Sequence, residues 1–214
     1  MTAPPYWPQA CAHLAGQDAV LAQLIAQFPG SVVKSRGAAL ETLQRAIVGQ
    51  QISVKAADAV WHRCVALLGH PNDPAAWLAP ADEGLRACGL SGQKVRYVRG
   101  IAQAFAAGQL HPHRWPTMPD TAVLTELVAL PGVGVWTAEM FLMFHLTRPD
   151  VLPLGDLGLI NAFKKHYGAQ WKTPTDLRGW QGRLSRHAAK HWVPYRSVAT
   201  WYLWRSLDPH EVGY

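Results

Sequence analysis

The 214-residue sequence contains no run of 18 or more apolar residues, so it predicts no membrane-spanning helix. Its first residues, Met1 to Trp7, lack a basic start followed by an apolar stretch, so we expect no secretory signal. Cysteine is scarce, since only Cys11, Cys64 and Cys88 occur, far apart in the chain. They are too few and too dispersed for a four-cysteine iron–sulfur cluster, and they predict reduced, mostly buried thiols of a cytosolic protein.

The chain also lacks a lysine-rich tail, a low-complexity tract and an internal repeat. Its formal net charge of +6 favours encounters with polyanions such as DNA or RNA, although charge alone is weak evidence for either. A hydrophobic content of 49% is enough for the core of one domain or of two packed lobes. Ten tryptophans are many for this length, and we expect core packing to occupy most of them.

Apolar residues recur at helical spacing along nearly the whole chain, and strand-like alternation is confined at most to residues 31–33. Ser53, Ser91 and Asp120 are predicted helix caps, and Pro194 is placed in the first turn of the last helix. The sequence therefore predicts an all-α protein of about ten helices, over residues 18–28, 38–49, 54–68, 74–78, 82–88, 92–107, 120–130, 135–145, 156–167, 175–190 and 194–207.

Residues 130–134, Leu-Pro-Gly-Val-Gly, form a predicted tight hairpin between two apolar helices. Pro131 fixes one φ angle, and Gly132 and Gly134 permit positive φ and let the backbone approach a ligand closely. The first amides of the following helix are unpaired and suit an anion such as a DNA phosphate. An ordinary helix C-cap without a ligand is the alternative, but the apolar helices and the basic charge favour contact with nucleic acid.

A short loop follows the second hairpin helix, residues 153–158, and carries Asp156 at its tip. Taken alone, Asp156 is best explained as the N-cap of the next helix, because aspartate is a favoured cap. Asp150 and Glu139 are rival carboxylates for a catalytic role. Asp150 follows Arg148-Pro149 and is predicted to lie in a solvent-facing turn, and Glu139 lies within the second hairpin helix.

The hairpin and this loop together resemble the helix-hairpin-helix DNA glycosylases, in which a Gly/Pro-rich loop carries an aspartate. The resemblance implies a two-lobed all-helical fold with a base-binding cleft between lobes, one lobe being residues 36–146 and the other residues 1–35 with 147–214. His13, Leu14 and Asp18 already resemble the first helix of the shared core. The resemblance therefore implies a single catalytic unit and a monomer, without the additional N-terminal α/β domain of one relative.

The resemblance also implies the chemistry. Asp156 would stabilise the oxocarbenium-like sugar formed as the base leaves and would help to activate water. Relatives that also cut the DNA backbone have a lysine nucleophile two residues after Gly134, whereas this chain has Trp136. Trp136 therefore predicts a monofunctional enzyme without lyase activity and resembles the 3-methyladenine DNA glycosylase II branch.

Members of that branch release alkylated purines such as 3-methyladenine and 7-methylguanine in base excision repair. These bases carry positive charge, and an aromatic face attracts a cation by about 0.5–2 kcal/mol. Residues 194–204 resemble the closing helix of the group, and Trp204 matches an aromatic of the base pocket. The base pocket is predicted to contain Trp136, Trp204, Met140 and Leu157. For each tryptophan, core packing is the alternative.

Residues 46–53 resemble the helix and loop that enter the DNA minor groove, where Gln51 would fill the gap left by the flipped base. Relatives often carry an apolar wedge there, so Gln51 is a departure, and a polar loop capped by Ser53 is the alternative. Residues 89–94 resemble another segment of the group, in which Lys94 either touches phosphate or is a surface lysine. The predicted DNA contacts are Gly132, Gly134, Thr137, Gln50, Gln51, Ser53 and Lys94.

By resemblance alone, the main-chain carbonyls of Val128, Leu130 and Val133 would hold a structural Na⁺ or K⁺ ion, and no cofactor is required. The expected partner is double-stranded DNA with damaged bases, in the bacterial cytoplasm or in a eukaryotic nucleus, and no membrane is involved. Two alternatives stay open. One is a glycosylase for other lesions, such as hypoxanthine, ethenoadenine or oxidised guanine. The other is a non-catalytic helix-hairpin-helix DNA-binding protein.

Overall fold

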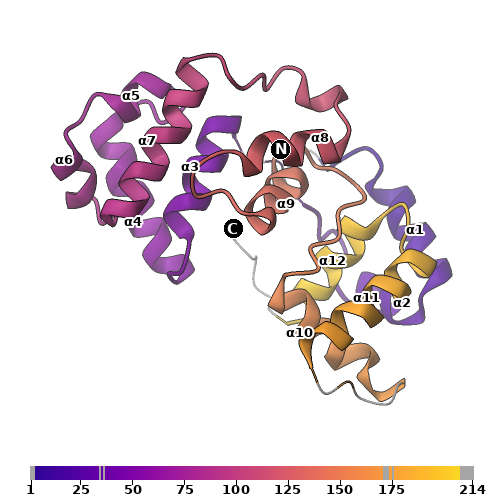
Figure 1. Cartoon of the computed structure of the whole chain (residues 1–214). Coiled ribbons are helices and arrows are strands. Elements are labelled where there is room, and N and C mark those ends of the chain that lie inside the picture. The colour runs from indigo at the N-terminus through magenta and orange to yellow at the C-terminus, as the bar shows by residue number, and fades with distance from the viewer. Residues whose placement is uncertain (1–2, 34, 36, 171–173, 175, 208–214) are drawn as a thin grey trace. The chain divides into compact units, whose positions relative to one another are not determined.

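The computed structural model describes residues 3–33, 35, 37–170, 174 and 176–207. Throughout these residues the regular structure is helical, as Figure 1 shows. It comprises twelve α-helices and two short 3₁₀ helices, and no strand occurs among the described residues. The prediction of an all-α protein is therefore confirmed, and residues 31–33 have no regular secondary structure. No helix in the described part of the chain is long and apolar enough to cross a membrane.

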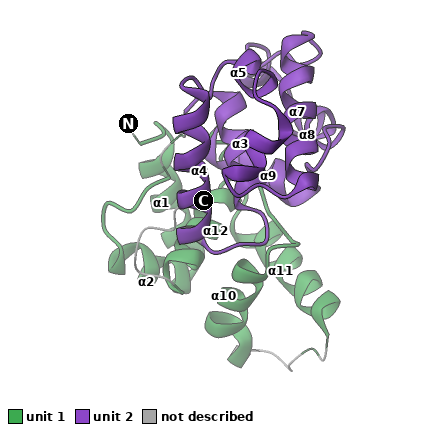
Figure 2. Cartoon of the chain, turned by 90° about the vertical axis from the view of Figure 1, so that its left-hand side faces the viewer, with its two compact units in different colours: residues 1–35, 147–212 green, residues 36–146, 213–214 purple. Residues whose placement is uncertain are grey.

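The chain divides into two compact units, coloured separately in Figure 2. Unit 1 comprises Met1–Ser35 and Thr147–Val212, and unit 2 comprises Arg36–Leu146 and Gly213–Tyr214. Unit 1 contains α1 (Trp7–Gln17), α2 (Ala19–Gln27), α10 (Leu157–Tyr167), α11 (Leu177–His191) and α12 (Arg196–Arg205), with a 3₁₀ turn at Gly168–Gln170. Unit 2 contains α3 (Ala39–Gly49), α4 (Val54–Leu68), α5 (Pro74–Leu78), α6 (Asp82–Ala87), α7 (Gly92–Ala106), α8 (Asp120–Val128) and α9 (Val135–Phe144), with a 3₁₀ turn at Trp115–Thr117.

Asp18 is the central polar residue of unit 1. One carboxylate oxygen accepts the amides of Val20 and Leu21 and so caps α2. The other accepts Tyr167 Oη, His187 Nε2 and Trp192 Nε1 at 2.8, 2.8 and 2.9 Å. Burial acts to raise the pKa of Asp18, but these hydrogen bonds outweigh it and lower the pKa to about 2. The carboxylate therefore ties the start of α2 to α10 and to the end of α11.

In unit 2, α3, α5 and α6 pack against α7, and α4 packs against α3 (Figure 1). The buried stripe of α7 is Val95, Val98, Ile101 and Ala102, and it follows the helical spacing of the sequence. Cys64 and Cys88 are buried here as free thiols, whereas Cys11 of unit 1 is half-buried. The described tryptophans are buried in the two cores, except Trp136.

The caps predicted at Ser53 and Ser91 are confirmed, because their hydroxyls accept the amides of Ala56 and Lys94. The cap predicted at Asp120 is wrong. Pro119 is the N-cap, since its carbonyl accepts the amides of residues 122 and 123, and Asp120 is the first helical residue, where the helix dipole favours its charge.

Some helix ends also differ from the prediction, and one helix was not predicted. α8 ends at Val128, before the hairpin turn begins, and α12 starts at Arg196, two residues after Pro194. The predicted start of α11 at residue 175 lies outside the described residues, and Asp176 caps this helix. α1 was not among the predicted helices.

Candidate functional site

The hairpin of unit 2 is a tight turn with a defined geometry. The amide of Val133 donates to the carbonyl of Leu130 at 3.2 Å, which closes a four-residue turn. Pro131 occupies its second position, and Gly132 occupies its third with φ +79°. This is the arrangement of a type II turn, in which proline presets one φ and the positive φ favours glycine. The sequence therefore encodes the reversal between α8 and α9 locally.

Two glycines let the turn lie against α7. A Cβ added to Gly132 would overlap the ring of Tyr97, so the backbone of the turn packs directly on that ring. A Cβ added to Gly100 would come within 2.5 Å of Pro131 Cγ, so the proline ring fits where α7 has no side chain. Substituting either glycine would push the turn away from α7. The turn is thus held by the fold before any ligand arrives.

Gly134 differs from Gly132, because nothing inside the protein requires it to lack a side chain. Its φ is −87°, and a Cβ there would meet no atom within 4 Å. Gly134 is the N-cap of α9 and has no side chain that could bond the first amides of that helix. Open space beside a helix start that the N-cap residue does not cover with a side chain suits a phosphate oxygen, which needs a close approach to the backbone.

The start of α9 presents two large apolar side chains to solvent. Val135 and Trp136 are 55% and 37% exposed. Two other predicted site residues of this helix, Thr137 and Met140, are buried. Among the candidates in α9, Trp136 is therefore the one whose ring is open to a ligand in this structure.

The loop between α3 and α4 is tied to the hairpin through Gln50. Its Nε2 donates to the carbonyl of Gly132 at 2.9 Å. Lys94 Nζ donates to the carbonyls of Val48 and Gln50, both at 2.8 Å, and burial lowers the pKa of Lys94. The structure thus places Gln50 and Lys94 as ties that position this loop, whereas the phosphate contact of Lys94 stays a prediction.

The tip of the same loop is exposed and conformationally strained. Gln51 has φ +60°, a left-handed conformation that costs a residue with a Cβ about 1 kcal/mol or more. Ile52 follows it and is 41% exposed. Ile52 is not among the predicted site residues, although it stands beside the predicted wedge Gln51. The tip therefore presents both a polar and an apolar side chain that could enter a base stack.

The predicted catalytic aspartate lies in unit 1. Asp156 is 6% exposed and is the N-cap of α10. Its Oδ1 accepts the amide of Leu159 at 2.6 Å and the indole Nε1–H of Trp204 at 2.9 Å. A Cβ on Gly158 would lie 3.1 Å from that oxygen and 3.4 Å from the indole nitrogen. Glycine at this position therefore leaves room for the tryptophan to reach the carboxylate.

The loop before Asp156 is anchored by α11 and α12. Gln181 Nε2 donates to the carbonyl of Leu154 at 2.9 Å, and the amide of Val151 donates to Ser197 Oγ at 2.8 Å. Asp150 lies in a turn, as predicted, but its carboxylate does not simply face solvent. Arg196 Nε and Nη2 donate to its two carboxylate oxygens at 2.7 and 2.9 Å, and the pair is partly buried. Asp150 is thus engaged in holding the loop.

The structure therefore groups the candidates by unit. Asp156, Trp204 and the 60% exposed Leu157 belong to unit 1, and the hairpin, Trp136 and the loop of Gln51 belong to unit 2. Trp204 itself is only 3% exposed, so the hydrogen bond to Asp156 is the interaction that this structure supports for it. Its stacking on a base stays a prediction.

The carbonyl groups predicted to hold a monovalent cation surround the turn. Leu130 O already accepts the amide of Val133, whereas no hydrogen bond among the described residues reaches the carbonyls of Val128 or Val133. No three His, Cys, Asp or Glu side chains gather as metal ligands in the described chain. A donor set of neutral main-chain oxygens fits Na⁺ or K⁺ better than a transition metal.

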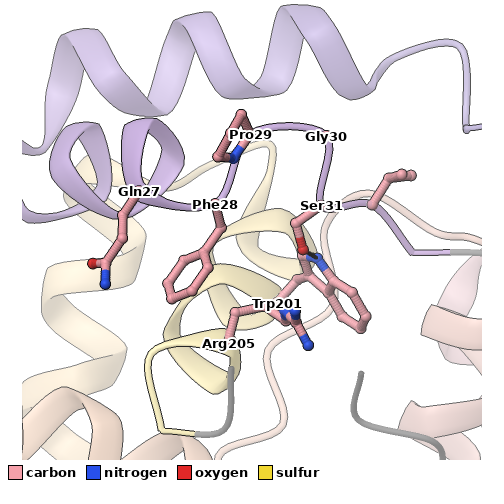
Figure 3. A pocket seen from close by; sticks show the side chains of 8 residues that line it. Gln27, Phe28, Pro29, Gly30, Ser31, Trp201 and Arg205 are labelled. Carbon is pink, nitrogen blue, oxygen red and sulfur yellow. Dashed lines mark hydrogen bonds between the residues drawn. The ribbon is translucent and has the colours of Figure 1, made fainter. Parts of the chain in front are cut away.

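A cavity of about 370 Å³ lies in unit 1, between the segment after α2 and α12 (Figure 3). Figure 3 shows Phe28, Trp201 and Arg205 among its walls, and the Arg205 guanidinium lies 5.8 Å from the centre of the Phe28 ring. None of the predicted site residues lines it. The cavity is therefore separate from the carboxylate of Asp156 and does not account for its chemistry.

Comparison with known proteins adds independent findings. The family model described as HhH-GPD superfamily base excision DNA repair protein matches residues 44–179, which include both the hairpin and Asp156. The Bacillus subtilis protein YfjP is 32% identical over 78% of this chain, and the match spans 58% of YfjP. The chain thus corresponds to little more than half the length of that relative.

Two solved structures are similar over nearly the whole chain. The DNA-3-methyladenine glycosidase of Bacillus halodurans is 34% identical, with a TM-score of 0.80, covering 93% of this chain and 89% of that one. The 3-methyladenine DNA glycosylase Mag1 of Schizosaccharomyces pombe, solved in complex with abasic DNA, is 28% identical. Its TM-score is 0.78, and the match covers 92% of this chain and 96% of Mag1.

Proposed function

The chain belongs to the HhH-GPD superfamily of base excision DNA repair proteins, and from this we propose that it is a monofunctional DNA glycosylase for alkylated purines. It would hydrolyse the N-glycosidic bond of bases such as 3-methyladenine and 7-methylguanine. The observation that carries the proposal is the buried carboxylate of Asp156, whose Oδ1 is held by an amide and an indole N–H. The names of the two solved relatives support the choice of substrate.

The hairpin would grip the DNA backbone. The open space at Gly134 and the positive end of the helix dipole at the start of α9 suit a phosphate oxygen, and the type II turn holds Gly132 next to this helix start. Gln50 links the turn to the neighbouring loop through a hydrogen bond, so the phosphate-binding turn and the predicted wedge Gln51 would keep a fixed position relative to each other. Extruding a base costs a few kcal/mol, and least at weakened pairs, which adds selectivity for damage.

Asp156 would act when the glycosidic bond breaks. Positive charge develops on the deoxyribose as the base leaves, and a nearby carboxylate stabilises that charge. The two hydrogen bonds to Oδ1 orient the carboxylate before the substrate binds. Schiff-base chemistry would need an amine nucleophile two residues after Gly134, and this chain has Trp136 there. Water therefore completes the reaction in this proposal, and the DNA backbone is not cut.

Alkylated purines are selected in this proposal by charge and by leaving-group quality. A cationic base gains about 0.5–2 kcal/mol over an aromatic face, and Trp136 offers such a face at the start of α9. Trp204, Met140 and Leu157 are the other predicted pocket residues, and each role is a separate proposal that its own variant tests. Met140 is buried beneath the surface of α9 and would act through packing.

The proposed partner is double-stranded DNA that contains a damaged base, bound by a monomer. Such a substrate places the protein in the cytoplasm of a bacterium or in the nucleus of a eukaryotic cell. The carbonyls of Val128, Leu130 and Val133 fit a Na⁺ or K⁺ ion, which would stiffen the hairpin. It would not take part in bond cleavage.

Duplex DNA treated with a methylating agent tests the proposal, with released bases separated by chromatography and strand breaks scored without alkali. We expect release of 3-methyladenine and 7-methylguanine and no strand cleavage. Trapping with borohydride should capture no covalent complex. Tight DNA binding without release would contradict the substrate assignment, and hypoxanthine, ethenoadenine and oxidised guanine would then be assayed. Binding without release of any of them would indicate a non-catalytic DNA-binding protein.

A further inference from the structure

The positive charge of the protein is unevenly divided between its two units. Unit 1 contains eleven lysines and arginines and six aspartates and glutamates, which gives a net charge of +5. Unit 2 contains nine basic and eight acidic residues, which gives +1. The unit that holds the hairpin is therefore almost neutral. Most of the attraction to a polyanion must arise from unit 1.

Within unit 1 the charge is concentrated on α11. This helix of 15 residues, Leu177–His191, contains four basic residues and no aspartate or glutamate. Its buried stripe is Trp180, Leu184 and Ala188, which anchors one face in the core of unit 1. Arg178, Arg186 and Lys190 are exposed and have no ion pair with any residue that the structure describes.

These three cations follow one row of the helix surface. Arg178, Arg186 and Lys190 are spaced at multiples of four residues, and the missing position of the row is Gly182. The guanidinium Nη1 of Arg186 would lie 3.5 Å from a Cβ on Gly182, so Arg186 extends back along the helix over the glycine. The row spans 12 residues, or about 18 Å of helix. A DNA strand carries one phosphate per about 3.4 Å of axis, so the row faces several phosphates.

This arrangement does not stabilise the helix itself. Arg178 lies in the first turn, where the helix dipole disfavours a cation. Arg186 and Lys190 are four residues apart, and like charges at that spacing destabilise a helix by about 0.2–0.5 kcal/mol. Gly182 within a helix costs about 1 kcal/mol relative to alanine. Since a merely solvated face would gain from interspersed acidic residues, an external anion best accounts for the row.

We propose that the exposed face of α11, formed by Arg178, Arg186 and Lys190, is a docking surface for the phosphate backbone of duplex DNA. It acts in addition to the hairpin of unit 2. The choice of DNA as the polyanion rests on the proposed function. Guanidinium groups suit this role because they bind phosphate oxygens through paired N–H donors. This surface supplies DNA affinity that depends on the salt concentration and not on the base sequence. The hairpin fixes the position of the protein along the duplex.

The salt dependence of DNA affinity tests the proposal. The variant R178Q/R186Q is compared with the control R86Q/R114Q, which removes two exposed arginines from unit 2 and lowers the net charge equally. Affinity for undamaged duplex is measured from 50 to 200 mM salt, and thermal unfolding confirms that both variants fold. Each lost phosphate contact reduces the slope of log K against log salt by about 0.9. We expect a reduction of about 1.8 for R178Q/R186Q and well under 1 for the control.

Equal reductions in the two variants would overturn the proposal, because net charge alone would then explain the effect. An unchanged slope in R178Q/R186Q would also overturn it and leave α11 as a solvated face. Vesicles that contain phosphatidylserine form a parallel arm, and loss of vesicle binding without loss of DNA binding would point to a membrane instead. Base release is scored separately. A protein that releases no base but keeps the α11-dependent slope would refute the proposed function and not the docking surface.

Discussion

Replacing Trp204 with phenylalanine separates two roles that one side chain could have. Phenylalanine keeps an aromatic ring for packing or for stacking on a base, but it removes the indole N–H that lies 2.9 Å from Asp156 Oδ1. Both side chains are buried, so water does not readily replace the lost donor. If Trp204 positions the catalytic carboxylate, the substitution acts on the chemical step. If it only stacks on the base, phenylalanine preserves most of the activity.

The expected magnitude follows from the hydrogen bond. A bond to a charged group contributes about 1.5–3 kcal/mol, and each 1.36 kcal/mol is a factor of ten in rate. We therefore expect Trp204→Phe to slow base release under single-turnover conditions by about 10- to 150-fold, with unchanged affinity for lesion DNA.

Trp201→Phe is the matched control, because Trp201 lies on the same helix and its indole N–H donates to Ser31 Oγ instead. We expect its rate to stay within about threefold of wild type. Gly158→Ala gives a second route to the same perturbation, since its Cβ would crowd the hydrogen bond between Trp204 and Asp156. A wild-type rate in Trp204→Phe, or equal losses in both tryptophan variants, would refute the positioning role.

Other predictions concern the hairpin and the polar core of unit 1. Gly132→Ala should lower the free energy of unfolding by about 1–3 kcal/mol in urea titrations, because its φ is +79° and Tyr97 occupies the space. Gly134→Ala should change the free energy of unfolding by no more than about 1 kcal/mol, because the added Cβ meets no protein atom. It should weaken DNA binding, because the Cβ occupies the space proposed for a phosphate. Wild-type DNA affinity in this variant would contradict the proposed phosphate contact at Gly134. Because the pKa of Asp18 falls to about 2 on folding, its contribution is complete above about pH 4 and is lost as pH falls towards 2. Asp18→Asn should lower stability at pH 7 by about 2–4 kcal/mol and flatten acid unfolding between pH 4 and 2, and an unchanged thermal melt would count against this network.

Features encoded by neighbouring residues were predictable from the sequence. Pro131 and Gly132 specify a type II turn through their own backbone preferences, so the hairpin needs no distant contact to be recognised. The caps at Ser53, Ser91 and Asp156 bond to amides three residues ahead, which makes them equally local.

The interactions that hold the candidate site are between residues far apart in sequence. Trp204 and Asp156 are 48 positions apart, and Arg196 and Asp150 are 46 apart. No local pattern distinguishes a carboxylate with such a partner from one that faces solvent, which is why the turn at Asp150 was predicted and its ion pair was not. Lys94 shows the same limit, because its bonds to Val48 and Gln50 cross from α7 to another loop. The fold class follows from periodicity, but the partners of polar side chains follow from packing.

The most direct test of the account compares wild type with Asp156→Asn in single-turnover release of 3-methyladenine and 7-methylguanine from methylated duplex DNA. Affinity for the same DNA is measured in parallel. Asparagine keeps the size of the side chain and an oxygen that can accept the Leu159 and Trp204 hydrogens, but it carries no charge. We predict loss of most of the release rate with DNA affinity retained. Release by the variant at the wild-type rate would contradict the role of Asp156 on which the mechanism depends.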